Sequence, residues 1–328
     1  MQPILSRRAT SSLLALPALI TGRPARAQWH PTRPVRLIVP FPPGQANDIF
    51  ARIIAERANE GAFAGGRIVV ENRGGAGGTI GMQSVVVAPP DGHTLVFGSL
   101  ATLAINPAIM RGVPYDPERD FAPVVRVFEG HLVLVVPAQG PHADVASLIK
   151  EVKAGGTDYA SSGPGSTQHM GAELFLQGLG ARATHVPYRG SGPALADVAT
   201  GAVDFAFESG ASAMPMVRAG LLRALAVSSA ARQPALPEVP TVAEAAGLPG
   251  YAVLGSGGIL APARTPQAVL AGLYEGLAAA LADPTVRARI TEAAATPIAE
   301  GPDPFAAFIR SELAKWREVA RVGDIRLE

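Results

Sequence analysis

Short apolar stretches followed by turns and helical patterns recur along the chain. Residues 35–41 (VRLIVPF) are almost entirely apolar and rich in branched side chains, which predicts a buried β-strand. The sequence Pro42-Pro43-Gly44 then predicts a turn. A helix is expected next, with an apolar face that comprises Ile49, Ile53, Ile54 and Ala58. The predicted unit is therefore a strand, a turn and a helix.

The same unit is repeated several times. Further strands are predicted at residues 67–71, 94–98, 132–136, 159–161, 184–187, 203–207 and 222–227. Further helices are predicted from Thr79, at 144–153, from the turn 162–166 through Leu176, and at 193–200, 267–282, 284–294 and 304–322. Strands that alternate with helices predict an α/β fold with mostly parallel sheets flanked by helices.

The order of these units predicts two lobes with a ligand cleft between them. Two groups of strands and helices are separated by segments that can cross from one lobe to the other, near residues 122–129 and 251–260. We expect residues 28–127 and 253–328 to form the first lobe and residues 128–252 to form the second. The helices at the end of the chain then complete the first lobe.

Residues 1–27 have the pattern of a secretory signal peptide. Arg7 and Arg8 precede the uncharged, largely apolar run 13–20, and Ala25-Arg26-Ala27 provides small residues at a cleavage site. The apolar run is much shorter than the roughly 20 residues that span a bilayer. A disordered tail or an anchor helix are the alternatives. Export of the chain is the interpretation that this pattern favours.

Composition and charge exclude several classes of protein. With 328 residues, of which 48% are apolar and 17% charged, the chain suits about two globular domains and not a disordered chain. Without the four arginines of residues 1–27, 24 Lys+Arg stand against 27 Asp+Glu, a net charge of −3. No basic surface therefore indicates a nucleic-acid partner. The absence of cysteine excludes disulfides, thiolate metal sites and cysteine nucleophiles.

Small and polar residues follow four of the predicted strands, at residues 41–47, 99–102, 161–167 and 208–209. Ligands of open α/β sheets bind beyond the carboxyl ends of the strands. At least two of these turns lead into helix N-termini, which favour an anion, and Ser162, Ser166 and Thr167 add hydroxyl donors. A small carboxylate held between two lobes is one interpretation. The alternative is that these residues serve only as turns and helix caps.

Motifs for catalysis or cofactor binding are incomplete. Gly75-Ala76-Gly77 begins a dinucleotide fingerprint, but Ile80 stands where its third glycine belongs. Residues 147–150 match S-x-x-K, but they lie within a predicted helix and lack the accompanying motifs. No G-x-S-x-G and no H-x-x-x-H pair occurs. We therefore expect neither a cofactor nor a metal, and His169 is interpreted as a packing or capping residue.

Several blocks of sequence resemble the Bug-type substrate-binding proteins of tripartite tricarboxylate transporters. These blocks are residues 35–48 (VRLIVPFPPGQAND), 70–81 (VENRGGAGGTIG), 89–95 (PPDGHTL), 115–124 (YDPERDFAPV), 159–175 (YASSGPGSTQHMGAELF), 185–195 (HVPYRGSGPAL) and 223–250. They occur in order and span essentially all of the chain after residue 27. The resemblance implies a two-lobed periplasmic binding protein of type II, which closes on a small carboxylate and delivers it to a membrane permease.

The resemblance also implies which residues contact the ligand. In the family, the turn after the first strand grips a carboxylate, partly through bridging waters. The matching ligand-binding positions here are Phe41, Pro42, Pro43, Gly44, Ser99, Thr102, Ser162, Ser166, Thr167 and Glu208. We add Gln45 and Ser209, which lie in the same turns, as further candidate ligand-binding residues. Two positions depart from the family pattern: Gln45 stands where glycine is usual, and Glu208 stands where aspartate is frequent.

Three functions are compatible with these features. The first is a monomeric periplasmic protein that captures a dicarboxylate, a tricarboxylate, an amino acid or an aromatic acid for a permease. The second is a binding module that reports to a sensor kinase. The third is an exported enzyme that acts on a carboxylate, with Glu208 and His169 as the candidate acid and base. The first is the function that the sequence favours.

Glu208 raises a question about selectivity, because an unpaired carboxylate in the cleft would repel a carboxylate ligand. Three arrangements would relieve this repulsion. Glu208 can pair with an arginine such as Arg189, take up a proton, or face a hydroxyl or amino donor on the ligand. The remaining alternative is that Glu208 turns to solvent, as exposed glutamates usually do.

The signal-peptide interpretation makes a direct prediction. We expect cleavage after Ala27, which leaves Gln28 as the first residue of the exported protein. N-terminal sequencing of protein recovered from the periplasm measures this position. A start more than a few residues away from Gln28 would contradict the assignment.

Overall fold

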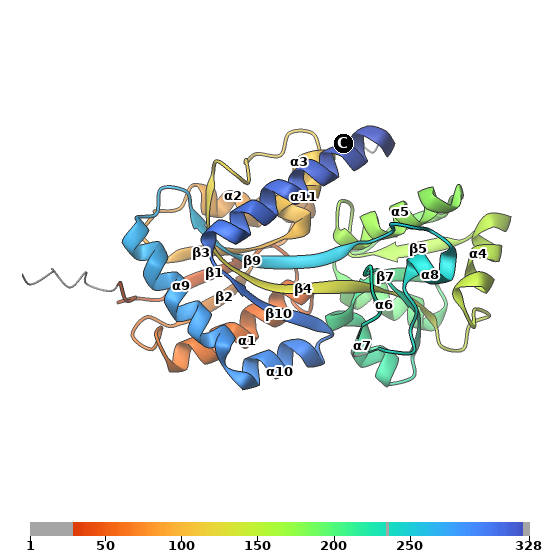
Figure 1. The fold of residues 1–328 in the computed structure, drawn as a ribbon, viewed down its shortest axis with the longest axis horizontal. Helices are drawn as coiled ribbons and strands as arrows, with labels where there is room; N and C mark the ends of the chain where they lie inside the picture. The colour runs from red at the N-terminus through yellow and green to blue at the C-terminus, as the bar shows by residue number, and fades with distance from the viewer. Residues whose placement is uncertain (1–28, 234–235, 324–328) are drawn as a thin grey trace, which may run out of the picture.

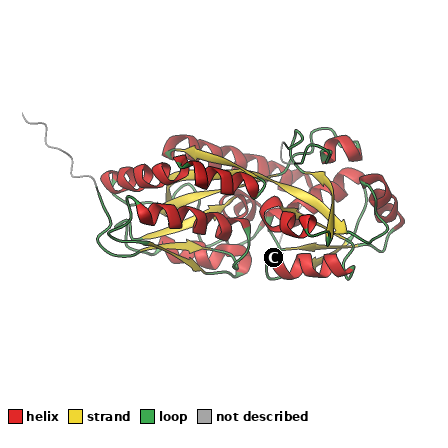
Figure 2. Ribbon diagram, turned by 90° about the horizontal axis from the view of Figure 1, so that it is seen from below, coloured by secondary structure: helices red, strands yellow, loops and turns green. Residues whose placement is uncertain are grey.

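The computed structural model describes residues 29–233 and 236–323, and it has two lobes joined by long strands (Figure 1). Residues 1–27, the predicted signal peptide, lie outside the described residues. The first lobe holds β1, β2, β3, α1, α2, α9 and α10, and the second holds α4 to α8 with β5 to β8. Figure 2 shows helices on both faces of the strands in each lobe.

The elements follow one another in the order that the sequence patterns predict, with several additions. The strands are β1 (Val35–Val39), β2 (Ile68–Asn72), β3 (Thr94–Ser99), β4 (Phe121–Pro137), β5 (Asp158–Ser161), β6 (Thr184–Pro187), β7 (Phe205–Ser209), β8 (Leu222–Val227), β9 (Leu254–Pro262) and β10 (Ala295–Glu300). The helices are α1 (Ala46–Glu60), α2 (Thr79–Val86), α3 (Asn106–Ile109), α4 (Val145–Ala154), α5 (Thr167–Leu179), α6 (Ser191–Thr200), α7 (Gly210–Arg218), α8 (Val242–Ala246), α9 (Gln267–Ala282), α10 (Pro284–Glu292) and α11 (Pro302–Gly323). Two short helical turns, η1 (Ala76–Gly78) and η2 (Ala101–Ile105), precede α2 and α3.

The ten strands in the described part of the chain form one mixed sheet that runs through both lobes. Its order is β2-β1-β3-β9-β4-β7-β5-β6, and β8 and β10 each pair with β4 as well. The outer pairs β1–β2, β1–β3, β5–β6 and β5–β7 are parallel, whereas all pairs that involve β4 or β9 are antiparallel. The expectation of mostly parallel sheets therefore holds for the outer strands of each lobe, whereas β4, which leaves the first lobe, and β9, which returns to it, pair antiparallel with all their neighbours.

Two long strands carry the chain between the lobes. β4 and β9 run side by side across the centre of the molecule (Figure 1), paired from Phe121 with Pro262 to His131 with Leu254. Beyond this stretch, β4 continues into the second lobe, where it pairs with β7 and β8. A single strand thus contributes to the sheet of both lobes.

Arg126 ties the crossing strands to the end of the chain. This side chain of β4 is only 5% exposed, and its Nε donates to Ser256 Oγ of β9 at 3.0 Å. Its Nη1 forms an ion pair with Glu300 Oε2 of β10 at 3.1 Å, and its Nη2 pairs with Glu129. The guanidinium also lies 3.7 Å from the centre of the Phe308 ring of α11. Four elements therefore share one nearly buried cation whose charge is balanced by two carboxylates.

Several elements were not predicted from the sequence. β10 pairs antiparallel with β4, although the end of the chain was expected to be entirely helical. Its sequence (ATPIAE) is short, contains Pro297 and lacks regular alternation, so only its partner strand identifies it. α7 was missed because Pro215 interrupts its helical pattern.

The hydrophobic core is not divided cleanly between the lobes. One cluster in the first lobe surrounds Phe50, Phe63 and Phe97. A second cluster contains Phe207 of β7 but also Ile105 of η2 and the fully buried Trp316 of α11. Apolar packing therefore continues from the second lobe into η2, α3 and α11. In the described ranges, no helix is long and apolar enough to cross a membrane.

The packing around the crossing strands β4 and β9 predicts different effects of substituting two glycines of β9. A Cβ on Gly258 would lie 2.5 Å from Val125 O and 2.6 Å from the Phe305 ring, whereas one on Gly255 would meet only Gly130 O at 3.9 Å. We expect Gly258→Ala to destabilise the protein by about 1–3 kcal/mol through overpacking, and Gly255→Ala to change stability by less than about 0.5 kcal/mol. Urea unfolding of both variants measures the difference, and equal stabilities would contradict this account of the crossing.

Candidate functional site

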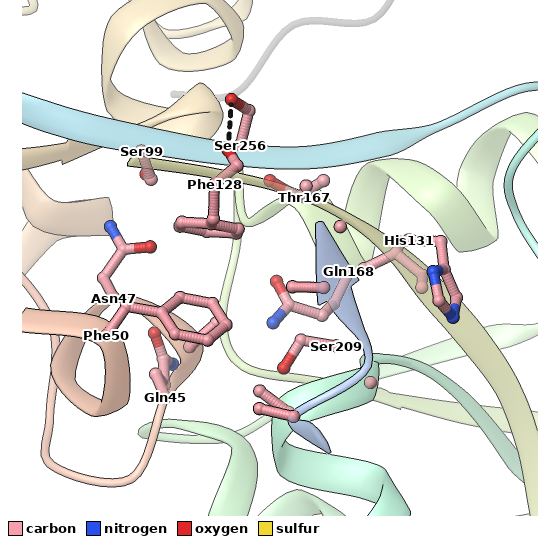
Figure 3. A pocket seen from close by; sticks show the side chains of 18 of the residues that line it. Gln45, Asn47, Phe50, Ser99, Phe128, His131, Thr167, Gln168, Ser209 and Ser256 are labelled. Carbon is pink, nitrogen blue, oxygen red and sulfur yellow. Dashed lines mark hydrogen bonds between the residues drawn. The ribbon is translucent and has the colours of Figure 1, made fainter. Parts of the chain in front are cut away.

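A pocket lies between the lobes beside the crossing strands. Figure 3 shows side chains from both lobes around it. Its polar lining residues are Gln45, Asn47, Ser99, His131, Ser166, Thr167, Gln168, Ser209 and Ser256. Its apolar lining includes Phe41, Phe50, Phe128, Leu132 and several alanines. The pocket is thus at the carboxyl ends of strands from both lobes, where open α/β sheets bind ligands.

Half of the predicted site residues line this pocket. These are Phe41, Gln45, Ser99, Ser166, Thr167 and Ser209. Of the others, Pro42 and Ser162 line an adjoining groove, Pro43 and Gly44 are exposed, and Thr102 and Glu208 are buried. The Thr102 hydroxyl accepts a hydrogen bond from the Ser99 N–H at 3.0 Å, so Thr102 shapes the turn and does not form the wall.

The turn after β1 is held in place by Asp48. This carboxylate accepts a hydrogen bond from the Gly44 N–H at 3.0 Å and another from Asn72 Nδ2 at 2.9 Å. Asn72 Nδ2 also donates to Phe41 O at 3.0 Å. Burial acts to raise the pKa of Asp48, but the hydrogen bonds from Arg52, Gly44 and Asn72 outweigh it and hold the pKa below its ordinary value. The turn therefore presents Phe41 and Gln45 to the pocket in a fixed conformation.

The N-terminus of α5 reaches the pocket from the second lobe. Ser166 is the N-cap, and its Oγ accepts from the His169 N–H at 3.1 Å. The His169 Nδ1 accepts from the Gly165 N–H at 3.2 Å, and its ring stacks on His185 with 4.1 Å between centroids. Burial lowers the pKa of His169 to about 4, so the ring is neutral and can accept this bond. His169 thus supports the capping turn from behind the pocket.

The N-termini of two further helices meet at the same place. α1 begins after Gln45, and α7 begins after its N-cap Ser209, whose Oγ accepts from the Ser212 N–H at 3.3 Å. The first N–H groups of any helix have no partner within the helix and carry a partial positive charge. Three such ends, of α1, α5 and α7, therefore surround one pocket and favour an anion there.

The lining residues carry no ionised side chain at neutral pH. They include no aspartate, glutamate, lysine or arginine, and their only titratable group is His131. Burial lowers the pKa of His131 to about 4, so this ring is neutral at pH 7. No lining side chain therefore supplies a counter-charge to an anion, and the donors that the pocket wall offers are main-chain N–H groups and neutral side chains.

Unpartnered polar atoms lie close to the pocket. The Gln45 Nε2 is buried and makes no hydrogen bond in the described structure, and it lies near the backbone of Gly190 in the second lobe. A buried donor of this kind costs free energy unless a ligand or a water accepts from it. Gln45 is therefore an available donor between the lobes.

Glu208 is fully buried behind the pocket wall. Its Oε1 accepts from Gln168 Nε2 at 2.7 Å and from the Ser209 N–H at 2.8 Å, while its Oε2 has no hydrogen-bond partner in the described structure. Burial raises the pKa of Glu208 to about 7, although the hydrogen bonds from Gln168 and Ser209 act in the opposite direction. The described residues give it no ion pair, so neither pairing with Arg189 nor exposure to solvent describes it.

Sequence reasoning missed several pocket residues. Asn47, Phe50 and Gln168 lie in the first turns of the helices that follow the predicted loops, so the helix-start signal was the signal that could have found them. Phe128, His131 and Ser256 lie on the crossing strands. Their exposure to the pocket depends on the pairing of β4 with β9, for which the local sequence has no signal.

The lobes touch one another at the rim of the pocket. Ser212 Oγ of α7 donates to Gly44 O of the first lobe at 3.1 Å. Next to this contact, the adjoining groove is lined by the glycine-rich residues 74–78 on one side and by Ser162, Tyr188 and Arg189 on the other. The described residues contain no group of three or more potential metal ligands.

Comparison with known proteins agrees with this geometry. A family model described as the tripartite tricarboxylate transporter family receptor matches residues 50–324. The protein BugT of Bordetella pertussis is 35% identical over 308 residues, which cover 93% of this chain and 94% of BugT.

Two solved structures from Rhodopseudomonas palustris are similar over nearly their whole length. Rpa4515, solved with adipate, is 36% identical with a TM-score of 0.86, over 90% of this chain and 99% of that one. MatC, solved with bound malate, is 33% identical with a TM-score of 0.83, over 88% of this chain and 99% of that one. These similarities confirm the expected resemblance to Bug-type proteins and the two-lobed α/β fold. The chain belongs to the tripartite tricarboxylate transporter receptor family.

Proposed function

We propose that the protein is a periplasmic solute-binding protein that captures a small carboxylate and delivers it to a membrane permease of the tripartite tricarboxylate type. The observation that carries this proposal is the meeting of three helix N-termini at a pocket with no ionised side chain. Such a pocket stabilises an anion without a counter-charge of its own. The two similar proteins solved with adipate and with malate support a carboxylate as the ligand.

The proposed binding mode places the ligand carboxylate at the helix N-termini. The N–H groups at the starts of α1, α5 and α7, the buried Gln45 Nε2, and the hydroxyls of Ser99 and Ser166 are its donors. The rest of the ligand contacts Phe50 and Phe128, whose ring centroids are 4.3 Å apart. The dipoles of the three helices suit a ligand with one or two carboxylates better than a tricarboxylate. No lysine or arginine lines the pocket to balance the charge of a third carboxylate.

Binding without catalysis suits the chemistry of the pocket wall. Its titratable group, His131, stays neutral, and the candidate acid Glu208 lies behind the wall. A general acid or base must be within hydrogen-bond reach of the reacting atom. We therefore propose a binding protein that acts as a monomer and is exported after removal of residues 1–27.

The proposed lobes are residues 28–127 with 253–328, and residues 128–252. They join where β4 pairs with β9, near His131 and Leu254. Closure about these strands would bring Ser212 to Gly44, a contact between the lobes that the structure contains. The ligand would then be enclosed by residues of both lobes.

The anion site predicts a change in thermal stability. A small carboxylate at one hundred times its Kd should stabilise the protein by about 2.7 kcal/mol and raise the melting temperature by several degrees. A thermal-shift screen of mono-, di- and tricarboxylates measures this, with the neutral amides of the same acids as the matched controls. Shifts with sugars or cations alone would contradict the proposal.

Lobe closure predicts a change in size. We expect the radius of gyration measured by small-angle scattering to fall when a carboxylate found in the thermal-shift screen saturates the protein, because the lobes rotate together about β4 and β9. Binding is monitored in the same sample by calorimetry. A radius that does not change at proven saturation would indicate a rigid site.

A further inference from the structure

Two amide side chains face the pocket from opposite lobes. Asn47 belongs to α1 in the first lobe, and Gln168 belongs to α5 in the second. Each amide has a nitrogen that only donates and an oxygen that only accepts hydrogen bonds. The orientation of each amide therefore decides whether the pocket offers a donor or an acceptor at that point.

Glu208 fixes the orientation of Gln168. The Gln168 Nε2 donates to Glu208 Oε1 at 2.7 Å, and the same oxygen accepts from the Ser209 N–H at 2.8 Å. An ionised carboxylate only accepts hydrogen bonds, and in the described structure Oε1 accepts both of these, so the Gln168 nitrogen faces Glu208. The Gln168 carbonyl oxygen is left for the pocket, as Figure 3 shows.

Asn47 is oriented by the main chain. Its Nδ2 donates to the carbonyl oxygen of Phe97 at 3.4 Å, and a carbonyl oxygen can only accept. The Asn47 nitrogen therefore faces β3, and in Figure 3 its oxygen points to the interior of the pocket. Each lobe thus presents one amide oxygen to the ligand.

Amide oxygens do not suit a carboxylate, because all of these atoms are acceptors. Burial of an unpaired acceptor against the ligand costs roughly 1–3 kcal/mol, about a fivefold to hundredfold change in affinity. A hydroxyl on the ligand would pair with such an oxygen while the carboxylate binds the helix N-termini. An ammonium group is less suitable, because it would lie beside the partial positive charges of the three helix N-termini.

We propose that the protein selects hydroxylated carboxylates, with the Gln168 carbonyl oxygen, assisted by that of Asn47, accepting a hydrogen bond from the ligand hydroxyl. In this proposal, which rests on the proposed function, Gln168 determines specificity and Glu208 is its positioning residue. The sequence suggested that Glu208 itself could face a donor on the ligand. Glu208 is buried and is not part of the pocket wall, so in this proposal it acts on the ligand through Gln168.

Matched pairs of acids test the proposal by calorimetry. The pairs are lactate and propionate, malate and succinate, 2-hydroxyglutarate and glutarate, and mandelate and phenylacetate, with aspartate and glutamate as the ammonium analogues. In the pair whose plain acid binds most tightly, we expect the hydroxy acid to bind about fivefold to tenfold more tightly. An equal or weaker affinity of the hydroxy acid, or a tighter affinity of the amino acid, would overturn the proposal. Absence of binding by every acid would instead contradict the proposed function.

Gln168→Leu removes the carbonyl oxygen that accepts from the ligand hydroxyl and approximately keeps the size of the side chain. We expect the hydroxy acid to lose about fivefold to tenfold in affinity while the plain acid changes by less than about twofold. Gln177→Leu, the same change at an exposed position of α5, is the matched control and should leave both affinities unchanged. Equal losses for the two acids in Gln168→Leu would make Gln168 a packing residue and overturn its role.

Substitutions of Glu208 test the positioning role through the ratio of the two affinities, which a loss of stability alone would not change. Glu208→Gln retains an oxygen that can accept from Gln168 Nε2, so the preference for the hydroxy acid should remain. Glu208→Leu removes this acceptor and leaves the Gln168 amide free to rotate, so the preference should fall toward that of Gln168→Leu. An unchanged preference for the hydroxy acid in Glu208→Leu would contradict positioning by Glu208. If this variant does not fold, the ratio of the affinities of the wild-type protein for the hydroxy acid and the plain acid still tests the substrate class.

Discussion

The N-termini of α1, α5 and α7 lie around one pocket without an ionised lining side chain. The strands and turns that precede these helices hold the N-termini in this position. Each helix contributes a partial positive charge of roughly half a unit at its N-terminus, within the first turn. These charges cannot be moved to another place without moving the strands that precede the helices. A binding site of this kind is therefore a property of the sheet, whereas a site built from arginines depends on a few flexible side chains.

The crossing strands and the turn after β1 both serve this arrangement. β4 belongs to the sheets of both lobes and pairs with β9 along the crossing, so the two groups of helix N-termini have a fixed relation to the hinge. Arg126 connects these strands to β10 and to α11. Asp48 and Asn72 hold the turn that leads into α1. The rim contact between Ser212 and Gly44 forms only when both lobes are in place, which couples closure to the position of that turn.

The parts of the site that depend on local sequence were predictable, and the parts that depend on pairing were not. Turns of small residues after apolar strands indicated Gln45, Ser99, Ser166 and Ser209, because a strand end and a helix start are both local signals. Phe128 and His131 face the pocket through the register of β4 on β9, which no local pattern encodes. Glu208 was predictable in one respect and not in another. The sequence indicated its place at the end of a strand, but its burial behind Gln168 follows from tertiary packing. β10 likewise became a strand only through its partner.

A crystal structure of the protein with a bound carboxylate tests the central claim most directly. The account predicts that the carboxylate oxygens lie about 2.7–3.2 Å from main-chain nitrogens at the starts of α1, α5 or α7, with no lysine or arginine in contact. It also predicts that the electron density places the ligand between Phe50 and the first turn of α5. A carboxylate paired with Arg189 in the adjoining groove, with the pocket filled only by water, would contradict the account.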